Sequence, residues 1–547
     1  MVAPIISVGK KIQRTLSNPR RIEAIEYPVR STLRHTPYTT PSYKSFNHLL
    51  QKSAQAEFQH FIKNHPFQSL ILKPLGDHFA QNELNKVIDS ISFELSLYPT
   101  GTIPASTNPN SSYSHFAWTR DMANKAFAMI EADCIDEAAK VLYSLGRFNN
   151  ENPQRSQLVS FHTAKHPNEP RERYRLDTNS HPHIRAAINH EGLMVRSEQG
   201  WGHNQLDALG AWLFVTFYLA NSLADKNNQR HNPKFLNELD TWLTKNVNGE
   251  NSIDSIFSVA LKTLNRIECW NNFDVGPWED IYAYKRASSI GICLSAAKEA
   301  KKYFTENGYN SINIYDQNSF KLELDNVIKN CTKALEERIP HDGREATECN
   351  DFPSDSSLTF LLYPYNPGLS EAQEQAILTT LYKNRLGTIG FTRRDNDNYV
   401  GMDYPYNLKS KGIFSELSHH GHKAAEWTLF DPLLATFYYK KFNDKYSTLG
   451  IIDEDILSLA ELHLKRVLAQ VTKEEDSYIK RYESSNQIKE EKITVAPLVL
   501  PEAYWFDSKQ NKWRPNENSP LLWSEANFIL MMKEALIATN TWGKSAS

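Results

Sequence analysis

A helical repeat of apolar residues constrains the fold more than any other feature, and it runs from Phe46 almost to the end of the chain. It predicts about thirteen helices and few strands. No low-complexity linker divides this region, so we expect one all-α domain over residues 46–547, with paired helices arranged as a toroid. The predicted helices span residues 46–63, 78–97, 121–131, 134–146, 204–224, 233–246, 252–268, 286–304, 316–337, 370–384, 423–441, 453–471 and 521–538.

Several connections between these helices are long, namely residues 147–203, 269–285, 339–369 and 386–422. They are rich in polar, glycine, proline and aromatic residues. Long loops in a compact helical domain are usually functional. We therefore expect these loops to gather at one end of the toroid and to line a site.

Residues 1–45 differ in composition, with eight Lys or Arg residues against two acidic ones and many Ser, Thr and Pro. This bias predicts a flexible basic N-terminal extension. The first residues lack the long apolar core of a secretory signal, so we expect a cytoplasmic protein.

The whole chain is close to charge balance, with 61 basic and 64 acidic residues. Such a balance gives no reason to expect nucleic acid or a membrane surface as a partner. The sequence contains no run of 18 apolar residues, so it predicts no transmembrane helix. The five cysteines are an odd number without metal-type spacing, which indicates reduced thiols. Nothing in the sequence identifies a protein partner.

An aromatic and polar loop delivers Trp278, Glu279 and Asp280 to the start of a long helix. A carboxyl group packed against an indole tends to stay protonated, while its neighbour can remain ionised and hold a substrate hydroxyl. The pattern suits the cleavage of sugars. It equally suits a helix start with acidic residues that favour the helix dipole.

Two further stretches place polar groups at helix starts. Arg120 and Asp121 stand side by side, where the Arg can donate to sugar hydroxyls and the Asp can accept from them. Gln205 and Asp207 open a very apolar helix, so their polar groups need partners at the exposed end. Helix capping is the structural alternative for both stretches.

The loops between 386 and 426 supply the remaining candidates. Residues 390–399 form a polar loop with two arginines, which makes it a candidate part of the site. The structural alternative is a plain solvated turn. Glu416 and Glu426 are each a candidate general base or a helix cap. A cluster of histidines at 419, 420 and 422 lacks a matching Cys or carboxylate spacing, so we do not expect a metal site.

Taken in order, these motifs resemble family 15 glycoside hydrolases, and most of all the glucoamylase-like region of phosphorylase kinase α and β subunits. The motifs are WTRD, QGWGHNQLDALG, WED followed by ASSIGICLSAAKEA, SEL ahead of EWTLF, and LPEAYWF with SPLLWSEANFIL. The resemblance covers roughly residues 75–540.

The resemblance implies an (α/α)6 barrel and inverting hydrolysis that releases glucose from non-reducing ends, with no metal or organic cofactor. It implies that Glu279 is the general acid and that Arg120 and Asp121 hold the terminal glucose. Asp280 stands where many members have Glu, and Arg393 matches an arginine whose neighbouring Tyr is absent here. The other expected substrate-binding residues are Trp118, Trp201, His203, Gln205, Asp207 and Trp278.

The general base is predicted at Glu416, with Glu426 as the alternative. Glu416 lies in a loop, where a side chain can project into a pocket, and its offset from Glu426-Trp427 matches the phosphorylase kinase pattern. Glu426 sits at the start of a predicted helix, a position that a structural acidic residue would fill equally well.

The expected function is therefore an exo-acting α-glucoside hydrolase on soluble α-glucans or maltooligosaccharides. One alternative is a glucan-binding or regulatory module of the phosphorylase kinase type, with hydrolysis weak or lost. Another is a trehalase or an α-1,6-glucosidase, because loop residues set the linkage.

Overall fold

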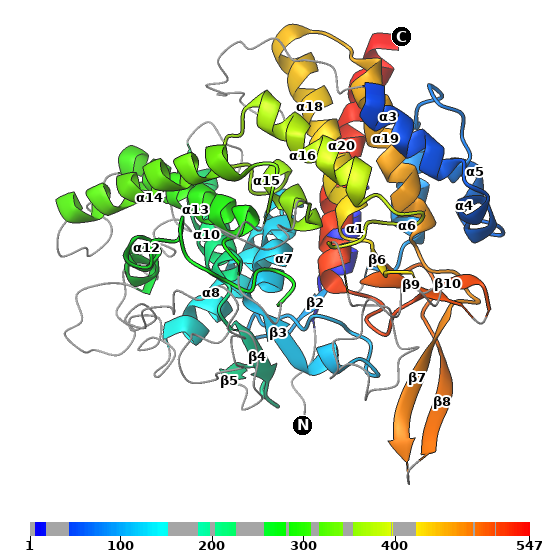
Figure 1. Cartoon of the computed structure of the whole chain (residues 1–547), viewed down its shortest axis with the longest axis horizontal. Coiled ribbons are helices and arrows are strands. Elements are labelled where there is room, and N and C mark those ends of the chain that lie inside the picture. Colours follow the sequence, from blue (N-terminus) through cyan, green and yellow to red (C-terminus); the bar gives the residue numbers. More distant parts are fainter. Residues whose placement is uncertain are drawn as a thin grey trace, which may run out of the picture.

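The computed structural model describes residues 6–17, 43–93, 95–150, 184–196, 203–225, 256–279, 284–307, 317–342, 354–394, 397, 423–484, 487–508 and 510–546. Helices dominate this part of the chain (Figure 1). They are α1 (Gly9–Leu16), α3 (Tyr43–Ser53), α4 (Ala56–Phe61), α5 (Gln68–Ile71), α6 (Gln81–Ser90), α7 (Thr119–Glu131), α8 (Ile135–Asn150), α10 (Leu206–Ala224), α12 (Ile256–Arg266), α13 (Ala287–Asn307), α14 (Gln317–Arg338), α15 (Thr359–Leu362), α16 (Glu371–Asn384), α18 (Phe430–Leu449), α19 (Glu454–Ala469) and α20 (Leu522–Ala546).

Some of these helices form a closed ring of contacts. α7 packs on α10, α10 on α13, α13 on α15, α15 on α18, α18 on α20, and α20 returns to α7. A second layer packs outside, with α8 on α7, α14 on α13, α19 on α18 and α6 on α20. Nearly all residues of α7 and α10 are buried, as expected for helices that other helices surround.

The apolar helix α10 belongs to this inner ring. It is long and apolar enough to cross a membrane by composition, yet 94% of its most apolar window is buried inside the protein. A Cβ added at Gly210 would lie 3.0 Å from the Cys293 backbone nitrogen, so glycine allows α10 and α13 to approach closely. These features define a core helix.

Short strands flank the starts of the ring helices. One sheet has the order β3-β4-β5, formed by Phe116–Trp118, Arg185–Ile188 and Met194–Arg196. Another has the order β10-β9-β6, formed by Lys512–Pro515, Ala503–Asp507 and Glu426–Trp427. Both are antiparallel. β3 runs directly into α7, and β6 lies just before α18.

Two other strand pairs complete the described part. β1 (Ile6–Ser7) pairs with β2 (Ser96–Leu97). β7 (Ser477–Ser484) and β8 (Gln487–Thr494) form a long antiparallel hairpin that projects from the helical body (Figure 1). No strands were predicted here from the sequence.

The prediction of a mainly helical chain is confirmed, and most predicted helices lie within a few residues of observed ones. The helix predicted at 423–441 instead begins at Phe430, because Glu426–Trp427 pair with β9 as a strand. The segment predicted at 233–246 lies outside the described residues.

Residues 6–17 differ from the prediction of a flexible extension. They form β1 and α1, and Val8, Ile12 and Leu16 are buried. These side chains recur every four residues and so lie on one face of the helix. That face packs on α6 and α20. The remainder of the predicted extension is largely outside the described residues.

Candidate active site

The starts of the ring helices meet at one place, because their first residues contact one another. Arg120 at the start of α7 reaches Asp207 at the start of α10 and lies over the ring of Trp523 at the start of α20. Trp523 stacks on Phe360 of α15, with ring centroids 5.4 Å apart. The loops and strands that precede these helices therefore converge on a common site.

Arg120 is the centre of this site. Its Nη1 donates hydrogen bonds to Gln205 Oε1 at 2.9 Å and to Asp207 Oδ2 at 3.2 Å. Its Nη2 lies 3.8 Å from Glu279 Oε1. Burial opposes the charge, but Asp207, Asp121 and Glu279 outweigh it and raise the pKa of Arg120. The guanidinium is therefore a permanent cation in a buried position.

Asp121 is buried and lies beside this cation. Its Oδ1 is 3.5 Å from Nε of Arg120, which is too long for a good hydrogen bond. No described residue donates a hydrogen bond to Oδ1. Burial raises the pKa of Asp121, and the charge of Arg120 opposes that rise. A buried carboxylate without donors has room to accept from a ligand hydroxyl.

Glu279 follows a turn that starts at Gly276, whose carbonyl accepts a hydrogen bond from the Glu279 backbone N–H at 3.1 Å. The φ angle of Glu279 is 56°, in the left-handed region that non-glycine residues rarely adopt. Such backbone strain concentrates at functional sites. The Oε1 atom of Glu279 accepts a hydrogen bond from Gln205 Nε2 at 3.2 Å.

Trp278 anchors an aromatic wall beside Glu279. Its Nε1 donates to Asp355 Oδ1 at 2.7 Å, and its ring lies 5.7 Å from the rings of both Trp427 and Phe430. Arg393 lies over Trp427 at 4.6 Å. The predicted residues Trp278 and Arg393 thus belong to one cluster. Asp355 was not predicted, because no sequence motif marks it.

Arg393 is held in place by a paired interaction. Its Nε and Nη2 donate to the two carboxylate oxygens of Asp397 at 2.9 and 2.6 Å. Two parallel hydrogen bonds of this kind fix the plane of the guanidinium. The arginine therefore presents a fixed face to Trp278 and Trp427.

Glu426, the alternative general base, has a structural environment. Its carboxylate accepts hydrogen bonds from the backbone N–H groups of Thr388, Ile389 and Gly390 at 3.0, 2.5 and 2.9 Å. Burial raises its pKa, and these donors oppose the rise. A carboxylate engaged by a turn in this way is poorly placed to activate water.

Glu502 is a carboxylate that the sequence prediction did not select. It directly precedes β9, and the side chains of Asn516 and Asn518 donate to its Oε2 at 2.7 and 2.6 Å. The described residues give Oε1 no hydrogen-bond partner. Burial raises the pKa of Glu502 to about 7, and Arg393 and Asp121 are close enough for their charges to act on it.

Of the other predicted residues, the structure describes Trp118 and His203 and leaves several outside the described part. Trp118 lies 4.8 Å from the ring of Tyr113 and 5.4 Å from the guanidinium of Arg185. His203 Nδ1 accepts a hydrogen bond from the Ile184 backbone at 3.2 Å. Trp201, Asp280 and Glu416, with the histidines at 419, 420 and 422, lie outside the described residues.

Within the part of the chain that is described, no group of three or more His, Cys, Asp or Glu could hold a metal.

Arg185, like Asp355 and Glu502, was not predicted from the sequence. It lies on β4, 3.5 Å from the ring centroid of Phe116, and it is buried. Burial lowers its pKa, and the charge of Glu279 opposes that effect. Its position places a second cation near Glu279, and only the pairing of β3 with β4 brings it there.

Comparisons with known proteins agree with the fold described above. No protein-family model and no curated protein sequence matches the chain. Among solved structures, a protein described as "Glycosidase Wild Type" matches with a TM-score of 0.50 and 14% identity, over 91% of this chain and 99% of that chain. A glucoamylase from Hormoconis resinae matches with a TM-score of 0.44 and 12% identity, over 90% of this chain and 74% of that one. A glucoamylase from Hypocrea jecorina matches with a TM-score of 0.45 and 13% identity, over 87% of this chain and 72% of that chain.

The structural neighbours of the chain are therefore glycosidases and glucoamylases. The first of these proteins shares its fold with nearly the whole of this chain, and the described part of this chain is mostly helical.

Proposed function

We propose that the ring of helices is the inner layer of an (α/α)6 barrel and that the chain is an inverting, exo-acting α-glucoside hydrolase. The observation that carries this proposal is the buried Arg120–Asp121 pair beside Glu279, with a second buried carboxylate, Glu502, on which the charges of Asp121 and Arg393 act. Soluble α-glucans or maltooligosaccharides are the proposed substrates, and the reaction releases glucose.

Arg120 and Asp121 would hold the terminal sugar. The guanidinium donates to a hydroxyl, and the neighbouring carboxylate, which lacks a hydrogen-bond donor on Oδ1, accepts from another. The ring of Trp523 lies 5.3 Å from the guanidinium of Arg120. We propose that this ring closes the inner end of the sugar site, which would favour attack at chain ends over attack within a chain.

Glu279 would act as the general acid and Glu502 as the general base. Protonated Glu279 gives its proton to the glycosidic oxygen as the bond from that oxygen to the anomeric carbon breaks. Water attacks that carbon from the opposite face and loses a proton to Glu502. Inversion needs the two carboxyl groups about 6.5–9.5 Å apart.

The choice of Glu502 rests on its hydrogen bonds. Both amide donors engage Oε2, which leaves Oε1 to receive a proton from water. A pKa of about 7 suits a base that works near neutral pH. Glu426 is committed to a turn. Glu416 remains the prediction from sequence, and substitution of each residue separates the three.

A glucan-binding module with weak or lost hydrolysis is the second candidate. The contact that favours it is the one between Glu279 and Arg120, because a nearby cation stabilises an ionised carboxylate and a general acid must be protonated. Under the enzyme proposal, a sugar hydroxyl competes for Arg120 and frees Glu279 to take up a proton.

The test is glucose release from maltose, longer maltooligosaccharides, glycogen, trehalose and isomaltose, measured beside binding of the same sugars. We expect release from the maltose series, with the β-anomer appearing first by NMR. Binding without release from any sugar would support the module. Release from trehalose or isomaltose alone would move the activity to that linkage.

A further inference from the structure

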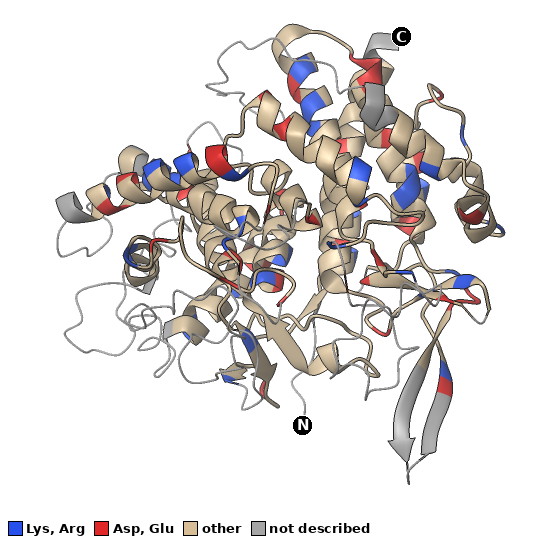
Figure 2. Cartoon of the chain, viewed as in Figure 1, with Lys and Arg blue, Asp and Glu red and all other residues tan. Residues whose placement is uncertain are grey.

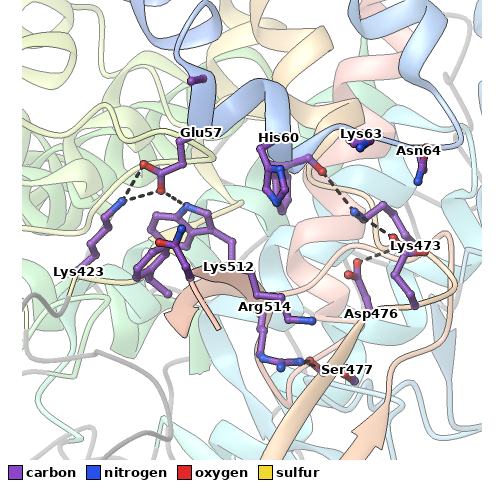
Figure 3. A pocket seen from close by; sticks show the side chains of 16 residues that line it. Glu57, His60, Lys63, Asn64, Lys423, Lys473, Asp476, Ser477, Lys512 and Arg514 are labelled. Carbon is purple, nitrogen blue, oxygen red and sulfur yellow. Dashed lines mark hydrogen bonds and ion pairs between the residues drawn. The ribbon is translucent and has the colours of Figure 1, made fainter. Parts of the chain in front are cut away.

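The structure has a pocket of about 580 Å³ that none of the residues assigned to catalysis lines. Figure 3 shows its lining residues. Its walls come from α4, from the segment before β7, and from the β9–β10 hairpin. Lys423 and Trp513 lie on one side, where both donate to the carboxylate of Glu57. The volume is in the range that holds one or two sugar units.

The lining of this pocket is positively charged. It contains five Lys or Arg side chains against three Asp or Glu, whereas the whole chain carries a formal charge of −3. Over the described elements outside the pocket, basic and acidic residues are interspersed, as along α14 (Figure 2). The excess of cations is therefore a local feature.

Most of these cations already have anionic partners. Lys423 pairs with Glu57 at 2.6 Å, Lys473 with Glu475 at 3.3 Å, and Arg514 with Asp507 at 2.8 Å. Arg514 also donates to Ser477 and Gln510, so its hydrogen-bonding capacity is largely used. These residues shape the pocket without leaving free positive charge.

Two lysines of the lining remain. Within the described residues, Lys63 and Lys512 form no ion pair and no side-chain hydrogen bond. Lys512 is half-buried, and burial together with the charges of Arg514 and Lys492 lowers its pKa, although Asp507 and Asp476 partly compensate. A cation held near other cations gains stability when an anion binds.

We propose that this pocket binds a phosphorylated sugar, with Lys512 and Lys63 at the phosphate and with Asn64 and His60 at the sugar hydroxyls. Lys512 and Lys63 together outweigh Asp476, the remaining acidic side chain of the lining, and a phosphate monoester with nearly two negative charges at neutral pH gains more from them than a carboxylate does. Lysine binds phosphate as a point charge, without the fixed geometry that arginine needs. The ligand is either a free sugar phosphate or a phosphate group on a glucan chain.

The location of the pocket gives it a structural link to Glu502. Lys512 and Trp513 lie on β10, and the chain continues from this strand to Asn516 and Asn518, which hold the Glu502 carboxylate. Binding at the pocket is nevertheless a separate property, because it requires no residue that takes part in hydrolysis.

The experiment is isothermal titration calorimetry of the whole chain with glucose 6-phosphate, inorganic phosphate, glucose, and a phosphorylated maltooligosaccharide. We expect glucose 6-phosphate to bind more tightly than inorganic phosphate, and excess glucose not to displace it. Tighter binding of the phosphorylated maltooligosaccharide would assign the ligand to glucan chains, and weaker binding would assign it to free sugar phosphates. Lys512→Glu should weaken binding at least tenfold, and Lys63→Glu should also weaken it.

The controls separate this site from the catalytic one. Lys329→Glu, an exposed lysine of α14, should leave binding unchanged, as should Glu279→Gln. Thermal unfolding shows whether each variant is folded. The proposal is overturned if neither glucose 6-phosphate nor the phosphorylated maltooligosaccharide binds. It is also overturned if Lys512→Glu and Lys63→Glu both bind like the parent, or if glucose displaces glucose 6-phosphate. None of these outcomes depends on whether the chain hydrolyses glucans.

Discussion

The Oε1 atom of Glu279 lies 3.8 Å from a guanidinium nitrogen of Arg120, and Gln205 bridges the two residues by bonding to both. The expected acid and the expected sugar-binding cation are thus parts of one buried network. A change in either residue should affect the other, so single substitutions need readouts for binding as well as for rate.

Arg120 should be essential for productive sugar binding. Arg120→Lys keeps the charge but loses the two-partner geometry with Gln205 and Asp207. Loss of hydrogen bonds to a charged group costs about 3 kcal/mol, which corresponds to a roughly 100-fold fall in kcat/KM. Steady-state kinetics on maltotriose checks this, with circular dichroism to confirm folding. A rate equal to the parent would assign Arg120 a structural role in its network with Gln205 and Asp207.

Glu279→Gln should abolish hydrolysis of maltooligosaccharides while sparing their binding. The amide has nearly the same shape but has no acidic proton to give to the leaving oxygen. Hydrolysis of α-glucosyl fluoride should be partly retained, because fluoride leaves without protonation. Calorimetry and both rate assays test this prediction together. Normal hydrolysis of maltotriose by the variant would rule out Glu279 as the acid.

Glu502→Ala should lower the rate by about 10²–10⁴-fold, the usual effect of losing a general base. Added azide should restore turnover by attacking from the face that the carboxylate has vacated. The matched variant is Glu416→Ala. Azide rescue of that variant, with Glu502→Ala unaffected, would return the base to the position predicted from sequence.

Glu426→Ala should act on stability. It would leave the backbone N–H groups of residues 388–390 without their acceptor in a buried turn. Each unsatisfied buried group costs about 1–3 kcal/mol, so the free energy of unfolding should fall by several kcal/mol. Urea unfolding measures this loss. A fully stable but inactive variant would instead indicate a direct role in the reaction.

The pH dependence should report on Glu502. Because a base must be ionised, kcat/KM should rise as pH increases through about 7, the raised pKa of this residue. The folded state also binds this proton more tightly than the unfolded state, whose pKa is near 4.5. Its contribution to stability is therefore present below about 4.5 and is lost as pH rises to about 7. Glu502→Gln should remove both dependences, and unchanged profiles would contradict the assignment.

The sequence alone determined the helical architecture and the main binding motif. Helical periodicity is a local property that each segment carries in its own apolar spacing, so segments such as α7, α13 and α20 could be located without tertiary information. Arg120 and Asp121 stand in a short motif at the start of α7 and Glu279 in a short motif ahead of α13, and the structure brings the three residues together. Even so, periodicity missed the helical part of residues 6–17, where short elements carry too little signal.

Only the tertiary structure decided which carboxylates are available for chemistry. Glu426 and Glu502 are both single acidic residues within two positions of an aromatic one in the sequence. Glu426 meets a turn from residues 388–390, whereas Glu502 meets two asparagine side chains that leave one oxygen open. These partners come from distant parts of the chain, and hydrogen bonding and burial depend on which segments pack together. No local pattern could therefore distinguish the carboxylate held by a turn from the one whose second oxygen has no hydrogen-bond partner among the described residues.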